Sequence, residues 1–221
     1  YFSVDSIKQI IDNASAAGFG YIMLGVGNDG MRFLLDDMSL TVNGMTYESD
    51  AVKTAIHAGN EAYYKFAVDE LTQSEMDAVL AYAKEKGMGV IPMLNTPGHM
   101  DAILAAATSL TGTNCSYNGS ARTIDVTNST AVAFTQAFVQ KLILRFQGLQ
   151  DFNMGADEYA NDMFTGGSMG FGNLQSTGKY SYYVEYVNAV AALIKNAGMT
   201  PMAFNDGIYF ANNTSSGTFD T

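Results

Sequence analysis

Short apolar runs alternate along this chain with longer segments whose apolar residues recur at helical spacing. Each run suits one buried strand, and each helical segment is long enough to lead back to the start of the next strand. Such alternation builds a parallel sheet with right-handed crossovers, which restricts the chain to the α/β class. The predicted strands cover residues 19–26, 88–94, 201–204 and the run from 152 that leads into Asp157 and Glu158.

Helix-initiation signals precede the segments with helical spacing. Ser3 or Asp5 can cap a first helix, and Thr72 with Glu75 forms a capping box before the next one. A long helix predicted over residues 125–146 has apolar residues at every fourth position, which favours a core face over a ligand site. These residues are Phe134, Phe138, Leu142 and Phe146.

Three segments show neither pattern and are expected to be loops. Residues 32–71 read as a long insertion within a single partial domain that spans residues 1–221. Residues 111–122 are polar, and residues 165–177 are rich in glycine. Long loops in compact domains usually carry function or move, so the insertion is a candidate for either role.

Polar residues follow each predicted strand. The sets are Asn28-Asp29, Asn95 with His99, Asp157-Glu158 and Asn205-Asp206. Successive strand ends of this kind form the active site of a TIM (β/α)8 barrel, whereas a doubly wound sheet gathers its ligands at one switch point. We therefore predict a barrel. Because a whole barrel takes about 250 residues, we expect an incomplete one covering roughly the first five β/α units, with Tyr1–Ser3 as the tail of an earlier strand and later strands beyond Thr221.

Asp157 and Glu158 are the strongest candidates for catalysis. Adjacent carboxylates at one strand end repel each other, which is costly unless chemistry uses both. The alternative is an Asp-Glu pair in a surface turn, and the apolar lead-in from residue 152 argues against it. His99 follows a Pro-Gly turn and is one of 2 histidines.

Charge and composition limit the kinds of molecule that this chain is expected to bind. The formal net charge is −11, which opposes binding to nucleic acid or anionic membranes and suits a neutral partner such as a sugar. No apolar run is long enough to insert into a membrane. Cys115 is the single cysteine, so an internal disulfide and a cysteine metal cluster are both excluded. The polar, weakly charged composition favours a secreted bacterial protein.

Two motifs carry a family resemblance. The segments 97–102 (PGHMDA) and 155–158 (GADE) resemble the signatures of the family-20 glycoside hydrolases, the β-N-acetylhexosaminidases. Residues 28–38, 157–162 and 201–209 are similar to catalytic modules of Gram-positive cell-surface members of that family. The resemblance runs almost end to end, and it implies a secreted or cell-surface enzyme that acts on glycans with a terminal N-acetylhexosamine.

The resemblance also implies a mechanism and a set of residues. It implies retaining hydrolysis in which the 2-acetamido carbonyl of the sugar attacks its own anomeric carbon, without cofactor or metal. Glu158 would serve as the acid and base, and Asp157 would orient the acetamide and balance charge. His99, Asn28, Asp29, Tyr159, Asn205 and Asp206 are the predicted substrate-binding residues. Many family members carry a His-x-x-Asp pattern near Asn28 and Asp29, and this chain lacks that histidine.

Three alternatives stay open on the sequence. A family member could release a disaccharide, as lacto-N-biosidases do. The second alternative is a non-catalytic carbohydrate-binding fragment. The chain has 0 tryptophans, whereas sugar sites depend on flat aromatic rings. The isolated segment is therefore expected to be weakly active or inactive. The third is a metal hydrolase that uses His99, Asp157 and Glu158, which would be a poor site with one histidine. The oligomeric state is not indicated.

Overall fold

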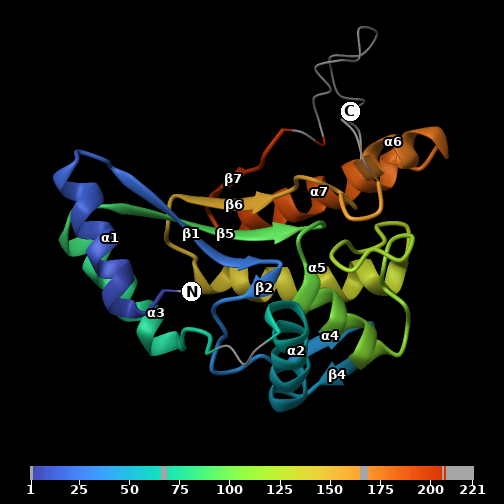
Figure 1. The fold of residues 1–221 in the computed structure, drawn as a ribbon, viewed down its shortest axis with the longest axis horizontal. Helices are drawn as coiled ribbons and strands as arrows, with labels where there is room; N and C mark the ends of the chain where they lie inside the picture. The colour runs from blue at the N-terminus through green and yellow to red at the C-terminus, as the bar shows by residue number, and fades with distance from the viewer. Residues whose placement is uncertain (1, 66–68, 165–168, 206, 208–221) are drawn as a thin grey trace, which may run out of the picture.

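The computed structural model describes residues 2–65, 69–164, 169–205 and 207, and its centre is a parallel sheet (Figure 1). Four strands pair in parallel in the order of the chain: β1 (Tyr21–Asn28), β5 (Gly89–Thr96), β6 (Asp151–Gly155) and β7 (Thr200–Met202). A two-residue strand, β2 (Gly30–Met31), folds back antiparallel on the outer edge of β1. The predicted parallel α/β sheet is confirmed.

The connecting helices begin largely where the sequence predicts. They are α1 (Val4–Ala16), α3 (Gln73–Glu85), α4 (Asp101–Thr111), α5 (Ser129–Arg145) and α7 (Tyr180–Asn196). Ser3 caps α1 and accepts from the backbone N–H of Ser6, and Thr72 and Glu75 form the predicted capping box of α3. Helix α5 begins later than expected, because the side chain of Asn128 caps it and Asp125 closes a preceding turn onto Thr127.

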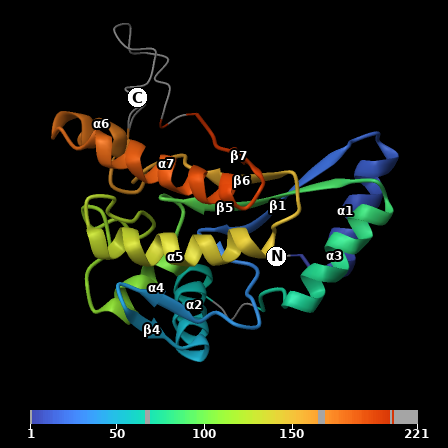
Figure 2. The same cartoon turned by 180° about the vertical axis from the view of Figure 1, so that it is seen from behind.

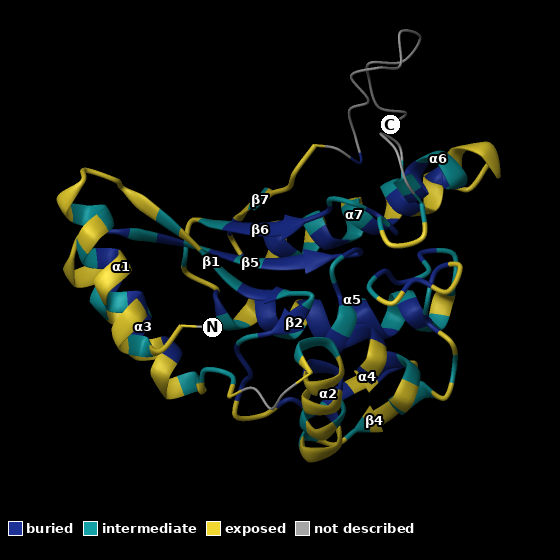
Figure 3. Ribbon diagram, viewed as in Figure 1, coloured by how far each residue is buried: buried dark blue, intermediate teal, exposed yellow. Residues whose placement is uncertain are grey.

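Helices α1, α3, α5 and α7 pack on one side of the sheet, and α4 packs against α2 (Ser49–Tyr64), α5 and β2 (Figures 2 and 3). Ile22 and Leu24 of β1 contact the cluster formed by α1 and α3, and Phe152 of β6 stacks on Phe146 at the end of α5. On the opposite face, Tyr21 and Met23 are 50% and 47% exposed. A doubly wound sheet would carry helices on both faces. The described residues therefore form an incomplete (β/α)8 barrel, with the open face as its interior.

The segment 32–71 is not a structureless loop, and that prediction was wrong. It contains a hairpin, β3 (Leu40–Val42) and β4 (Met45–Tyr47), followed by the helix α2 (Ser49–Tyr64). The hairpin closes because Asn43 and Gly44 both adopt positive φ, as a two-residue turn requires. Helix α2 packs on α4 at Gly59, where a side chain would lie 2.8 Å from the Cα of Ala102.

The glycine-rich segment 165–177 also contains a helix that was predicted as loop. Helix α6 (Met169–Ser176) buries Phe171 and Leu174. The ring of Phe171 lies against those of Tyr159 and Tyr183, so two apolar contacts outweigh the low helix propensity of the glycines. None of the helices within the described ranges has both the length and the apolarity to cross a membrane.

Candidate active site

Residues from three strand ends meet in one hydrogen-bonded line. Nδ1 of His99 lies 2.7 Å from Oδ1 of Asp29, and Nε2 of His99 lies 3.1 Å from Oε2 of Glu158. Asp29 follows β1, His99 follows β5 and Glu158 follows β6. Parallel strands bring their carboxyl ends to one edge of the sheet, which is why residues 59 and 70 positions apart become neighbours.

The backbone is strained where this line is built. Asp29, His99 and Glu158 have φ values of 61°, 50° and 46°. Left-handed conformations cost non-glycine residues about 1–3 kcal/mol each and cluster at functional sites. Gly155 and Ala156 are also left-handed, with φ of 70° and 64°. The chain therefore leaves the pleat before Asp157, so the two consecutive acids are not forced onto opposite faces of a strand.

A second set of contacts holds Asp157. Nδ2 of Asn95 lies 2.6 Å from Oδ1 of Asp157 and 2.9 Å from Oδ1 of Asn28. Asn95 is buried at the end of β5, with 1% of its surface exposed. One buried amide therefore joins the ends of β1, β5 and β6 and fixes the orientation of Asp157. The sequence placed Asn95 at a strand end but did not include it among the site residues.

Charge on the line is stabilised from within the protein. Burial raises the pKa of Asp29, but hydrogen bonds from His99 and from the hydroxyl of Tyr63 outweigh it and leave that pKa below its ordinary value. The hydrogen bond to Asp29 raises the pKa of His99, against a smaller opposing effect of burial. The pair therefore favours a carboxylate facing an imidazolium, which can donate from Nε2 to Glu158.

Glu158 has a further donor and access to solvent. Nδ2 of Asn161 donates to Oε2 of Glu158 at 2.6 Å. The Glu158 side chain is 42% exposed, whereas those of His99 and Asp29 are 11% and 14% exposed. The line thus runs from a buried carboxylate to one that a ligand can reach.

Tyr63 was missed by the sequence analysis. Its hydroxyl donates to Oδ2 of Asp29 at 2.9 Å from the last turn of α2. No local pattern in the sequence predicts this contact, and the segment that contains Tyr63 was predicted as a loop.

The structure describes two further predicted substrate-binding residues, Tyr159 and Asn205. Tyr159 is fully buried, and its hydroxyl donates to the carbonyl of Ile124 and accepts from the N–H of Val126. The structure places its ring in the core, and its predicted contact with substrate stays a prediction. Asn205 is exposed beyond β7, with no side-chain contact to Asp157 or Glu158 among the described residues. Asp206 lies outside the described residues.

Two other residues of the segment 32–71 have structural partners. The guanidinium of Arg32 donates to the backbone carbonyls of Asn28 and Gly30 and lies over the ring of Tyr64. The half-exposed His57 pairs with Glu70 at 3.1 Å. Among the described residues, no group of three or more His, Cys, Asp or Glu side chains is arranged to hold a metal ion.

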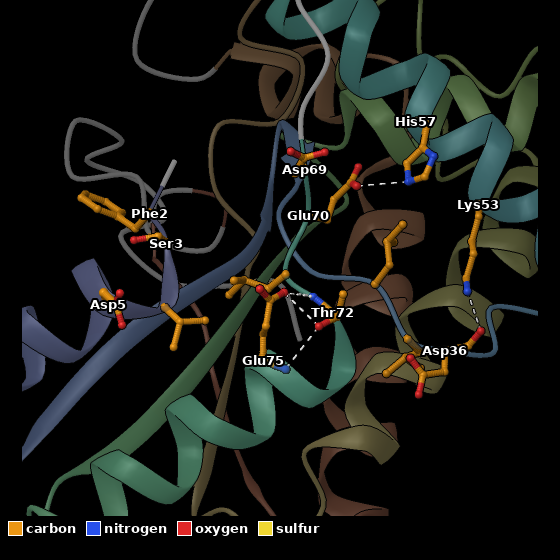
Figure 4. A pocket seen from close by; sticks show the side chains of 14 residues that line it. Phe2, Ser3, Asp5, Asp36, Lys53, His57, Asp69, Glu70, Thr72 and Glu75 are labelled. Carbon is orange, nitrogen blue, oxygen red and sulfur yellow. Dashed lines mark hydrogen bonds and ion pairs between the residues drawn. The ribbon is translucent and has the colours of Figure 1, made fainter.

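A separate hollow of about 740 Å³ lies near the start of α1 (Figure 4). Phe2, Asp5, Asp36, Lys53, His57 and Glu75 are among its lining residues, and none of Asp157, Glu158 or His99 is. Two of its acids have local partners: Glu75 closes the capping box of α3 and Glu70 pairs with His57. The hollow is therefore distinct from the site formed by Asp157, Glu158 and His99.

Known proteins resemble this chain over most of its length. A family model described as glycosyl hydrolase family 20, catalytic domain, matches residues 1–218. A structure of the pneumococcal virulence factor StrH, studied for N-glycan recognition and hydrolysis, is 44% identical with a TM-score of 0.89, over 95% of this chain and 51% of that one. A second structure, of the tandem catalytic modules of the pneumococcal exo-β-D-N-acetylglucosaminidase StrH, is 43% identical with a TM-score of 0.89, over 95% and 52%.

Two more distant relatives are also similar. β-Hexosaminidase subunit A2 of Dictyostelium discoideum is 26% identical over 141 residues, which is 62% of this chain and 25% of that protein. Dispersin B is 21% identical with a TM-score of 0.67, over 99% of this chain and 58% of that one, and at this identity the likeness concerns the fold alone. The chain spans about half the length of the two pneumococcal structures.

Proposed function

This chain belongs to glycosyl hydrolase family 20, and we propose that it supplies the acid/base residues of a β-N-acetylhexosaminidase. The observation that carries the proposal is the arrangement of Asp157 and Glu158. They are adjacent in sequence, yet each is held by its own buried partner, Asn95 for one and His99 for the other. Because the two acids have different hydrogen-bond partners, they can serve different chemical roles.

Glu158 is the proton donor in this proposal. It transfers a proton to the oxygen of the leaving group while the bond between that oxygen and the anomeric carbon breaks. The carboxylate that remains accepts from Nε2 of His99 and from Asn161, so its new charge is stabilised at once. In the second step Glu158 takes a proton from the water that attacks the anomeric carbon.

Asp157 acts on the sugar substituent. The acetamido oxygen of the substrate bonds to the anomeric carbon and gives an oxazolinium-like intermediate with positive charge on the ring. Asp157 accepts a hydrogen bond from the acetamide N–H and balances that positive charge, while the amide of Asn95 donates to Oδ1 of Asp157. No enzyme carboxylate bonds to the sugar, so the carboxylate spacing of ordinary retaining enzymes does not apply. Both anomeric substitutions invert, and the product retains its configuration.

Substrate and location are parts of the same proposal. We infer a glycan with a terminal β-linked N-acetylhexosamine, of which N-acetylglucosamine is the first candidate, because the similar pneumococcal structures are of an exo-β-D-N-acetylglucosaminidase. The low fraction of charged residues, 15%, supports a secreted or cell-surface location. Product analysis on defined oligosaccharides separates release of one sugar from release of a disaccharide.

The deciding experiment compares Glu158→Gln with Glu61→Gln in the protein at its natural length. Glu61 is exposed on α2 and serves as the matched control. In an alkyl N-acetylglucosaminide the alcohol leaves only when its oxygen is protonated. On this substrate Glu158→Gln should lose about 100- to 10,000-fold in kcat. With a dinitrophenyl leaving group the first step should be largely spared. Equal losses of the first-step rate on both substrates would refute the role of Glu158 as proton donor. A lack of turnover by the unmodified protein with binding retained would refute the enzyme proposal and favour a carbohydrate-binding role.

A further inference from the structure

Both oxygens of Asp29 are held by donors from different elements. Oδ1 faces Nδ1 of His99 at 2.7 Å, and Oδ2 accepts the hydroxyl of Tyr63 at 2.9 Å. The Asn28 amide is the next donor to Oδ2, at a weak 3.5 Å. Tyr63 is thus the strong second contact that fixes how the carboxylate is rotated against the imidazole.

The segment 32–71 holds Tyr63 firmly. The ring packs edge to face against Tyr64, with centroids 4.9 Å apart. Helix α2 ends directly after this pair with Lys65 in a left-handed conformation. The helix packs on α4 at Gly59, and the N–H of Ala102 in α4 donates to the carbonyl of Asp29 at 3.0 Å. The hydroxyl of Tyr63 and the backbone of Asp29 are therefore tied to one rigid pair of helices.

The charges around Asp29 explain why a second donor matters. His99, Tyr63 and Arg122 favour the ionised carboxylate, whereas burial opposes it. Tyr64 and Asp101 also lie within its electrostatic range, and the negative charge of Asp29 helps to raise the pKa of Asp101. His99 faces Asp29, Asp157 and Glu158. Tyr63 is a strong donor to Asp29 that carries no charge of its own near neutral pH.

We propose that Tyr63 is a positioning residue for the acid/base step, acting through Asp29 and His99 on Glu158. It orients the Asp29 carboxylate and withdraws part of its negative charge from the imidazole, so it limits how tightly His99 holds its proton. The segment 32–71 is thereby part of the reaction machinery. This inference rests on the proposed hydrolase function for its effect on rate, but its effect on His99 is measurable without turnover.

The first test is the NMR titration of the imidazoles. The chain has 2 histidines, so His57 serves as the internal reference. Tyr63→Phe should move the midpoint of His99 upward by about 0.5 pH unit, because Asp29 loses one donor and its negative charge then acts more strongly on the imidazole. The control is Tyr82→Phe, which removes an equivalent bond to Asp12 at 2.8 Å on the outer helices. It should leave His99 unchanged.

The second test is a double-mutant cycle in the protein at its natural length. Tyr63→Phe should lower kcat/KM for an alkyl N-acetylglucosaminide about 10-fold and shift the pH profile, whereas Tyr63→Phe added to Asp29→Asn should cost little more. Should Tyr63→Phe not fold, difluorotyrosine at position 63 donates more strongly and should move the His99 midpoint downward.

Two failures are distinguishable. An unmodified protein without turnover contradicts the hydrolase proposal and leaves the His99 titration as the measure of Tyr63. Additive losses in the cycle, or a His99 midpoint that neither change at position 63 moves, overturn the inference about Tyr63.

Discussion

The side-chain amide of Asn95 is bonded to the carboxylate of Asp157 at 2.6 Å, and this contact fixes one of the two acids. The donor is a neutral amide, so this contact places no added charge beside Asp157. Oδ1 of Asn95 is buried and accepts no hydrogen bond among the described residues. A buried polar atom without a partner is costly, and such atoms persist where function requires the arrangement.

Replacement of Asn95 by Asp should impair the reaction at neutral pH. The variant places a second carboxylate within hydrogen-bond distance of Asp157, and two such charges cannot both ionise readily, so the pair shares a proton. Asp157 then balances positive charge less well, and kcat should fall about 10- to 100-fold on proposed substrates. The measurement is the pH profile of kcat in the protein at its natural length.

The matched control for Asn95→Asp is Asn118→Asp. Asn118 is exposed in the loop 111–122, and among the described residues its side chain hydrogen-bonds to Asn173. A profile for Asn95→Asp that coincides with that of the control would contradict a role for Asn95 in holding Asp157.

Gly155→Ala should disturb the site more than its backbone strain alone predicts. At φ 70° a side chain costs about 1 kcal/mol, and a Cβ here would also collide with the amide of Asn95. Gly178 has φ 69°, and a Cβ added there would meet nothing within 4 Å, so Gly178→Ala isolates the backbone cost. Urea unfolding should show a loss about 1–3 kcal/mol larger for Gly155→Ala. Equal losses would mean that Asn95 moves aside freely.

Asp101→Asn should stabilise the fold at neutral pH. Burial, assisted by the charge of Asp29, raises the pKa of Asp101 to about 6 from an ordinary value of 3.8. The folded state therefore holds this proton more tightly than the unfolded chain. Stability falls as the pH rises from about 4 to about 6, and the whole cost is present above that range. An amide cannot ionise, so the variant should gain about 1 kcal/mol at pH 7 and little at pH 4.

Urea unfolding at several pH values checks the Asp101 prediction. Asp50→Asn is the control, because Asp50 is also in the first turn of a helix but is exposed. A gain for Asp101→Asn that is the same at pH 4 and pH 7 would exclude ionisation as its cause.

Tyr159→Phe should lower stability without weakening substrate binding. The hydroxyl satisfies the carbonyl of Ile124 and the N–H of Val126 in a buried region, so its removal should cost about 1–3 kcal/mol. KM should match that of Tyr182→Phe, whose ring is exposed on α7. A rise in KM with unchanged stability would instead support the prediction that Tyr159 contacts substrate.

Local pattern was sufficient for much of the fold. The capping box at Thr72 and Glu75 and the apolar runs of the strands depend on neighbours in sequence, and the structure confirms both. Helices α2 and α6 were missed because their stability comes from burial against distant segments. The low helix propensity of Gly170 and Gly172 in α6 is outweighed by the contacts of Phe171.

The sequence by itself determined the order of the four parallel strands and of the main helices between them, the family, and the strand ends that carry Asp157, Glu158 and His99. Only the tertiary structure decided which of these side chains meet. It brought Asn95 to Asp157 and Tyr63 to Asp29, and it buried Tyr159 in the core. The physical reason is that spacing along a chain fixes the face of a strand or helix, whereas a hydrogen bond between distant residues depends on left-handed turns and helix packing that no local pattern specifies.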